Sequence, residues 1–150
     1  MHSRRIFMLG LAAASLPGLT NPVFSQQTKP HRLVVQISSN DPALFNLVLN
    51  NVANVSKHYN DLAQEVEVEI VAYGPGLHML REDTSPVKDR LASFSKSMPN
   101  AVFTACGNTM DVMKKAEGKD IPVMSFAKVT ATGVARIMEL QENGWSYVRP

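Results

Sequence analysis

The amino-acid sequence predicts an α/β fold: a mainly parallel five-stranded sheet with helices on both faces. Two observations lead to this prediction. Short apolar runs of strand length alternate along the chain with segments whose apolar residues recur every three or four positions. Two of the predicted helices begin with a capping residue followed by proline. Strands that alternate with helices favour a parallel sheet, because each connection crosses back over a face of the sheet.

The first strand and the first helix are predicted near the start of the domain. Residues 32–38 form a short apolar run, and Asp41 and Pro42 follow it as a cap and a first helical residue. The apolar residues after them keep helical spacing over about five turns, and they are Leu44, Leu47, Val48, Val52, Val55 and Tyr59. Another face of this helix either meets a partner or is solvated, and it carries Asn46, Asn50 and Asn54.

The middle of the chain repeats the alternation. Residues 67–73 predict the second strand, and the Gly-Pro-Gly segment 74–76 closes it as a tight turn. Ser85 and Pro86 give a second cap-and-proline signal, which opens a helix that continues through Val87, Leu91 and Phe94. Residues 101–105 are a buried type of third strand, and residues 110–116 follow as a helix.

The last third of the chain completes the predicted sheet. The fourth strand is placed at residues 127–131, although Val123 and Met124 compete with it. A helix begins at Gly133, and Gly144 is a plausible left-handed stop for it. Residues 145–148 then form the last strand.

The amino terminus has the pattern of a twin-arginine signal peptide. Arg4 and Arg5 stand directly before an apolar stretch that is too short to span a bilayer, and the small residue Ser25 suits a cleavage site. We therefore predict a signal peptide over residues 1–25, a linker over residues 26–31 and one domain over residues 32–150, located in the periplasm. The alternatives are an amphipathic first helix and an uncleaved anchor.

Composition limits the partners of the mature chain. Without residues 1–25 the chain has 13 basic and 13 acidic residues, because Arg4 and Arg5 leave with the signal. A formal charge of zero removes the main electrostatic argument for a nucleic-acid partner. No cysteine lies near the cleavage site, so we expect no lipid anchor and no stable membrane attachment after cleavage. The single cysteine, Cys106, excludes an internal disulfide.

The candidate site is predicted at the carboxyl ends of the strands, where ligands gather in open parallel sheets. Cys106 is the strong nucleophile there, at a point where a strand ends and a helix begins, and a helix amino terminus favours the thiolate. The alternative is that Cys106 is an inert packing residue at the end of a buried strand. The candidate ligand-binding residues at this edge are Asn40, Tyr73, Gly74, Gly76, Gly107, Asn108 and Thr109.

Other site chemistries have weaker signals. Segment 74–76 lacks the glycine spacing and the lysine of a phosphate loop, and the histidines share no metal-ligand spacing. His78 lies near the predicted crevice, where it either orients a ligand or is simply exposed. Glu67 and Glu69 share one face of the second strand and are interpreted as its polar side. No metal or organic cofactor is predicted.

Three separated segments of the chain, residues 71–76, 105–110 and 133–147, together resemble the DsrE/DsrF-like family, in a branch that is often exported. The resemblance covers about residues 32–150. It implies a small Rossmann-like sheet and self-association, typically as a trimer or hexamer. In members that act in sulfur relay, a cysteine at the end of the third strand carries persulfide sulfur, and Cys106 matches that position.

Two functions of different class are therefore expected. In the first, Cys106 takes sulfane sulfur from a donor protein or compound, holds it as a persulfide and passes it to an acceptor thiol. In the second, the protein is a non-catalytic oligomer that binds a small ligand or has a structural role, and Cys106 only packs. Members of one fold can serve either function.

Overall fold

The computed structural model describes residues 29–150, and the predicted signal peptide at residues 1–25 lies outside them. Among the described residues there are five strands: β1 His31–Ile37, β2 Val66–Ala72, β3 Ala101–Cys106, β4 Lys128–Thr130 and β5 Ser146–Val148. They form one sheet in the order β4-β3-β2-β1-β5, and every neighbouring pair is parallel. The predicted Rossmann-like α/β fold is confirmed.

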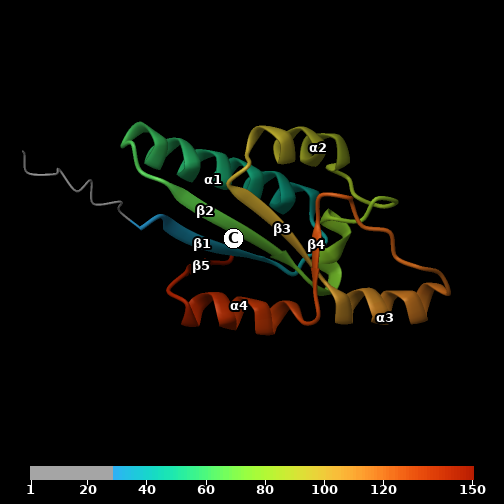
Figure 1. Ribbon diagram of the computed structural model, residues 1–150. Helices are drawn as coiled ribbons and strands as arrows, with labels where there is room; N and C mark the ends of the chain where they lie inside the picture. Colours follow the sequence, from blue (N-terminus) through green and yellow to red (C-terminus); the bar gives the residue numbers. More distant parts are fainter. Residues whose placement is uncertain (1–28) are drawn as a thin grey trace, which may run out of the picture.

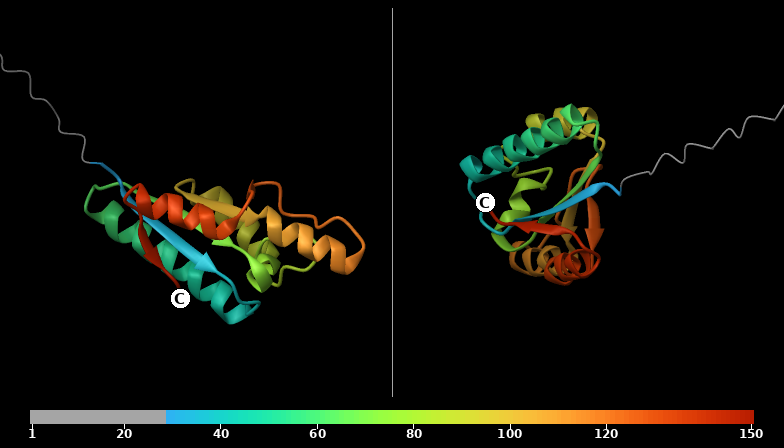
Figure 2. Two further views of the ribbon diagram at one scale, coloured as in Figure 1. Left: turned by 90° about the horizontal axis from the view of Figure 1, so that it is seen from below. Right: turned by 90° about the vertical axis from the view of Figure 1, so that its left-hand side faces the viewer.

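Helices cover both faces of this sheet (Figure 1). Helix α1 (Pro42–Asp61) and helix α2 (Lys88–Ser97) lie on one face, and helix α4 (Gly133–Glu142) lies on the other. Helix α3 (Gly107–Glu117) extends past the carboxyl ends of the strands, on the side of α4. Seen end-on, the sheet is the middle of three layers (Figure 2).

Helix α1 begins as its sequence predicts, and Val48, Val52, Val55 and Tyr59 of its predicted apolar face pack on the core. Asp41 Oδ1 accepts a hydrogen bond from the Ala43 amide at 2.8 Å, and Pro42 is the first helical residue. The buried residues are Phe45, Val48, Leu49 and Val52. Leu47, which the apolar pattern placed on the inner face, is 47% exposed.

The asparagine face of α1 meets a partner inside the same chain. Arg90 of α2 donates to Asn46 Oδ1 at 2.5 Å and to Asn50 Oδ1 at 2.6 Å. Asn54 is exposed. Asn46 and Asn50 thus join the two helices of one layer, while Asn50 and Asn54 remain exposed, as the interpretation of a solvated face expects.

Two predicted boundaries differ from the structure. The Gly-Pro-Gly segment opens a 3-10 helix, η1 (Gly74–Met79), instead of a tight turn. Helix α2 begins at Lys88, two residues after the predicted start at Pro86, and Ser85 lies in a turn before it. Its hydroxyl donates to the Met79 carbonyl at 2.7 Å and accepts from the Val87 amide at 3.3 Å, which stabilises a turn before the helix.

The end of the chain follows the prediction closely. Strand β4 forms at residues 128–130, and the competing residue Val123 makes only an isolated bridge to Arg81. Helix α4 starts at Gly133, and Gly144 after it has a φ of 82°, as a left-handed stop requires. No helix among residues 29–150 is long and apolar enough to cross a bilayer.

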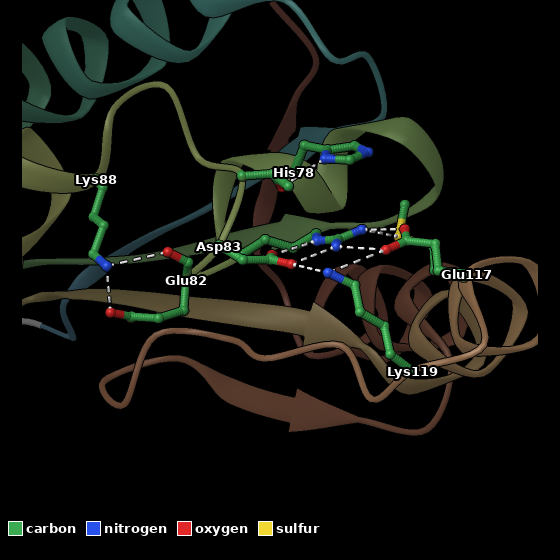
Figure 3. A network of polar contacts seen from close by, with 9 residues as sticks. His78, Glu82, Asp83, Lys88, Glu117 and Lys119 are labelled. Carbon is green, nitrogen blue, oxygen red and sulfur yellow. Dashed lines mark hydrogen bonds and ion pairs between the residues drawn. The ribbon is translucent and has the colours of Figure 1, made fainter.

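Helix α3 has no fully buried residue; Met110 and Met113 pack against the main core, and an ionic network holds its far end (Figure 3). Arg81, only 1% exposed, donates to both carboxylate oxygens of Asp83 and both of Glu117, the last residue of α3. Lys119 joins Asp83 at 2.9 Å. The bidentate geometry satisfies the buried guanidinium, so the segment after η1 is tied to the far end of α3.

The two faces of the sheet bury very different amounts of apolar surface. The main core lies between the sheet and helices α1 and α2. On the other face, α4 covers a small cluster of Val34, Val71, Ile137 and Leu140. Beside α4, the outer faces of β2, β3 and β4 line an open groove of about 620 Å³.

Candidate functional site

Cys106 lies at the carboxyl edge of the sheet, as the last residue of β3 and the cap residue of α3. Its backbone is extended, with φ −79° and ψ 114°, so the chain turns directly from strand into helix at this residue. The helix starts at Gly107, three residues before the predicted start at Met110. The thiol is therefore closer to the helix amino terminus than the sequence predicted.

Two helix amino termini converge on the sulfur atom. The amide of Gly133, the first residue of α4, donates a hydrogen bond to Cys106 Sγ at 3.2 Å. The amides of Asn108 and Thr109, in the first turn of α3, also contribute hydrogen bonds to the sulfur. The Asn108 amide is shared with the Ala131 carbonyl at 3.0 Å. These donors carry the positive ends of two helix dipoles, which favour a negative sulfur.

The hydroxyl of Thr109 links the sulfur to a neighbouring loop. It accepts a hydrogen bond from the Gly74 amide at 2.9 Å, where β2 passes into η1. The same side chain hydrogen-bonds Cys106. Because its acceptor site is occupied by the Gly74 amide, the hydroxyl proton is directed toward the sulfur.

The electrostatic balance at Cys106 favours the thiolate. Burial of the sulfur raises its pKa, but the hydrogen bonds from the Thr109 hydroxyl and from the amides of Gly133, Thr109 and Asn108 outweigh burial. The pKa of Cys106 is consequently below the ordinary value of a thiol. A thiol with this environment is a better nucleophile near neutral pH than an ordinary buried cysteine.

The sulfur is nevertheless covered. Cys106 is only 3% exposed, and the close approach of α4 provides the cover. A Cβ atom at Gly133 would lie 3.2 Å from Cys106 Cβ and 3.2 Å from Tyr73 Cβ. This spacing leaves almost no room for any residue other than glycine at the start of α4. Cys106 therefore does not open directly to solvent in this structure.

The structure places most of the candidate ligand-binding residues around the sulfur. Thr109 and Asn108 donate to it, Gly74 bonds Thr109, and Tyr73 packs on Gly133. Gly107 packs against β4, where a Cβ atom would lie 3.0 Å from the Thr130 carbonyl oxygen.

Gly76 and Asn40 have other surroundings. Gly76 is buried against the end of β1, and a Cβ atom there would lie 2.4 Å from the Ile37 carbonyl oxygen, which makes its role one of packing. Asn40 is exposed before α1, and it contributes none of the hydrogen bonds to the sulfur within residues 29–150.

A buried charged cluster beside this site was missed by the sequence analysis. Glu69 was interpreted as part of the polar side of β2, but it is only 5% exposed. Arg136 of α4 donates to its two oxygens at 2.9 and 2.8 Å, and the Thr104 hydroxyl donates at 2.8 Å. Burial raises the pKa of Glu69, but these hydrogen bonds and the charge of Arg136 lower it below its ordinary value.

One signal for this cluster is present in the sequence. The charged residues of β2 alternate with apolar ones, yet the predicted sheet is covered by helices on both faces, where a solvated carboxylate is unusual. A buried carboxylate needs a cationic partner. Its partner, Arg136, is in one of the motifs that carry the family resemblance. Glu67, in contrast, is half-exposed and pairs with Arg32 at 2.9 Å.

The described residues offer no metal site. No group of three or more His, Cys, Asp or Glu residues with suitable placement is found among residues 29–150. His31 stacks on Tyr59 with ring centroids 3.9 Å apart. His78 bonds the Thr84 hydroxyl at 2.8 Å, which accounts for its orientation without a ligand.

Comparison with known proteins gives a match among solved structures. No family model matches the chain, and no curated protein matches it. A solved structure of a protein of unknown function, MTH1491 from Methanobacterium thermoautotrophicum, is 30% identical and has a TM-score of 0.68. The match covers 80% of this chain and 99% of that one.

Proposed function

We propose that this chain, which belongs to the same family as MTH1491, is an exported DsrE/DsrF-like protein that carries sulfane sulfur as a persulfide on Cys106. The observation that carries the proposal is the convergence of two helix amino termini on Cys106 Sγ, with the Gly133 amide at 3.2 Å. A sulfur atom so placed is stabilised as a thiolate, which is the species that attacks a sulfane donor.

The proposed chemistry is two thiol exchange steps with no net oxidation. The Cys106 thiolate attacks the outer sulfur of a donor persulfide, the donor's sulfur–sulfur bond breaks, and the donor thiolate leaves with the electron pair. Cys106 then holds the transferred sulfur as a persulfide. An acceptor thiolate attacks that outer sulfur, forms its own persulfide and releases the Cys106 thiolate. The donors at Asn108, Thr109 and Gly133 stabilise negative sulfur at the start and end of this cycle.

The setting of this function is also proposed. The twin-arginine pattern in residues 1–25 supports export to the periplasm, and the family resemblance supports a trimer or hexamer. The donor is a protein or small molecule that already carries a persulfide or polysulfide, and the acceptor is a protein or small-molecule thiol. Cell fractionation tests the export, and the mass of the protein in solution tests the assembly.

A second function has one observation in its favour. Cys106 is 3% exposed, which is typical of a packing cysteine in a non-catalytic oligomer that binds a small ligand or has a structural role. This function needs no chemistry at the sulfur. The two proposals therefore differ in whether the folded protein exchanges sulfur at this residue.

The decisive experiment loads the folded protein with sulfur. The mature protein is incubated with a polysulfide at neutral pH, desalted and weighed by mass spectrometry, alongside Cys106→Ser. We expect sulfur adducts on the native protein, located at Cys106 and removed by an added thiol, and none on the variant. Absence of any adduct on the folded protein would retire the sulfur-carrier function and leave the binding or structural function.

Thr109→Val is the matched variant for the electrostatic part of the proposal. It keeps the nucleophile and nearly the same volume, but it removes the hydroxyl that hydrogen-bonds Cys106. We expect the pKa of the Cys106 thiol to rise, because one of the groups that stabilises the thiolate is lost, and sulfur uptake at neutral pH to be slower with the same final amount. An unchanged pH dependence would mean that the hydroxyl does not stabilise the thiolate.

A further inference from the structure

Access to Cys106 is controlled by the first turn of α4. Gly133 both donates to the sulfur and lies in close contact with Cys106 and Tyr73, so α4 must move before any molecule can reach the sulfur. The residues before it, Ala131 and Thr132, are exposed on the connection from β4. Movement of this turn therefore needs no rearrangement of the main core, which lies on the other face of the sheet.

One ion pair holds that turn on the sheet. Arg136 lies one helical turn after Gly133, and its amide bonds the Thr132 carbonyl at 3.0 Å, so Gly133 and Arg136 belong to the same turn. The guanidinium of Arg136 donates two hydrogen bonds, of 2.9 and 2.8 Å, to the buried carboxylate of Glu69. Thr104 orients this carboxylate through a bond of 2.8 Å. The bidentate geometry fixes both the distance and the direction of Arg136.

The ion pair and the sulfur lie on the same side of the sheet. Thr104 and Cys106 are alternate residues of β3 and so point to the same face. The open groove beside α4 is lined by Glu69, Thr104 and Arg136, and also by Thr130, which pairs with Cys106 in the sheet register. The groove thus reaches the position next to the covered sulfur.

We propose that Glu69 and Arg136 are positioning residues that keep α4 closed over Cys106, and that the sulfur becomes accessible from the groove when this pair separates. The inference rests on the proposed function for its biological meaning, but the cover itself is independent of sulfur transfer.

The test measures alkylation of Cys106 by iodoacetamide in the folded, mature protein. Glu69→Gln and Arg136→Gln each weaken the ion pair. We expect each variant to raise the alkylation rate by roughly tenfold or more, because the first turn of α4 then moves away from Cys106 more often. The pH at which the alkylation rate is half-maximal should also rise, because the Gly133 amide then hydrogen-bonds and stabilises the Cys106 thiolate for less of the time. Arg136→Lys keeps the positive charge but loses the bidentate hydrogen bond. Its alkylation rate should lie between those of the native protein and Arg136→Gln.

Arg32→Met is the matched control. It removes a single-bond ion pair of 2.9 Å with Glu67 on the same face of β1 and β2, and this pair does not include α4. We expect no change in alkylation rate or pH midpoint. An equal increase in the control and in the Arg136 variant, or no increase in either Glu69 or Arg136 variant, would overturn the inference.

Loss of folding is separated from local opening by a second variant and a second measurement. The double variant Glu69→Gln with Arg136→Gln leaves no buried unpaired charge, so it remains folded if a single variant does not. In the double variant the alkylation rate should stay constant at low denaturant, as expected for local opening. A rate that rises in proportion to global unfolding would overturn the inference. Fast alkylation without sulfur uptake would retire the proposed function and leave the cover mechanism standing.

Discussion

The two faces of the sheet differ in what holds them, and Cys106 lies on the face with the smaller apolar core. The face under α1 and α2 buries a continuous apolar core that includes Phe45, Ile70 and Phe103. The face under α4 buries four residues in its core cluster and relies on the Glu69–Arg136 pair and a groove lined largely by polar residues. The main apolar core lies on the side away from Cys106, so we expect local opening to occur first under α4.

The largest expected effect lies in the main core. Phe103→Ala removes a side chain that is fully buried and packs edge-on against Phe94 and Phe126. We expect the free energy of unfolding to fall by about 3–5 kcal/mol, as is usual for a buried phenylalanine. Urea unfolding followed by circular dichroism measures it. A loss as small as that of an exposed residue would mean that this face is not the main source of stability.

A smaller effect is expected from the equivalent truncation under α4. Ile137→Ala removes one of the four residues of the second cluster. We expect a loss of about 2 kcal/mol, at the low end for an isoleucine truncation, because the thin layer over this face can collapse into the space. Cys106 should also alkylate faster, since Ile137 helps to hold α4. If Ile137→Ala lowers the free energy of unfolding more than Phe103→Ala does, the face under α1 and α2 is not the main source of stability.

The smallest effect depends on pH. Because the folded-state pKa of Glu69 is lowered, its ionised form contributes stability above its unfolded pKa, and this contribution disappears as pH falls through the folded value. Glu69→Gln should therefore cost about 1–2 kcal/mol at pH 7, the scale of a charged hydrogen bond. The difference in free energy of unfolding between the variant and the native protein should become smaller below about pH 4. Urea titrations of both proteins at several pH values measure it, and a constant difference would contradict it.

Local signals in the sequence are sufficient for most of the elements. The cap at Asp41, the stop at Gly144 and the alternation of apolar runs all act within a few residues, and the structure has these features. The errors arise where a nearby group competes. The Ser85 hydroxyl bonds the Met79 carbonyl, so the second helix starts later than its cap-and-proline signal indicates. The helical spacing of apolar residues also does not distinguish Phe45, which is buried, from Leu47, which is 47% exposed.

The sequence by itself determined the α/β order of elements and put Cys106 at the junction of β3 and α3, because periodicity and capping depend on neighbouring residues. Only the tertiary structure decided that the sulfur is covered and which groups bond it. The Gly133 amide comes from 27 residues away, and the Arg136 side chain reaches Glu69 across 67 residues. Such contacts depend on the crossing of α4 over β1 and β2 from one edge of the sheet to the other. No local pattern encodes that path, since it results from how whole layers pack.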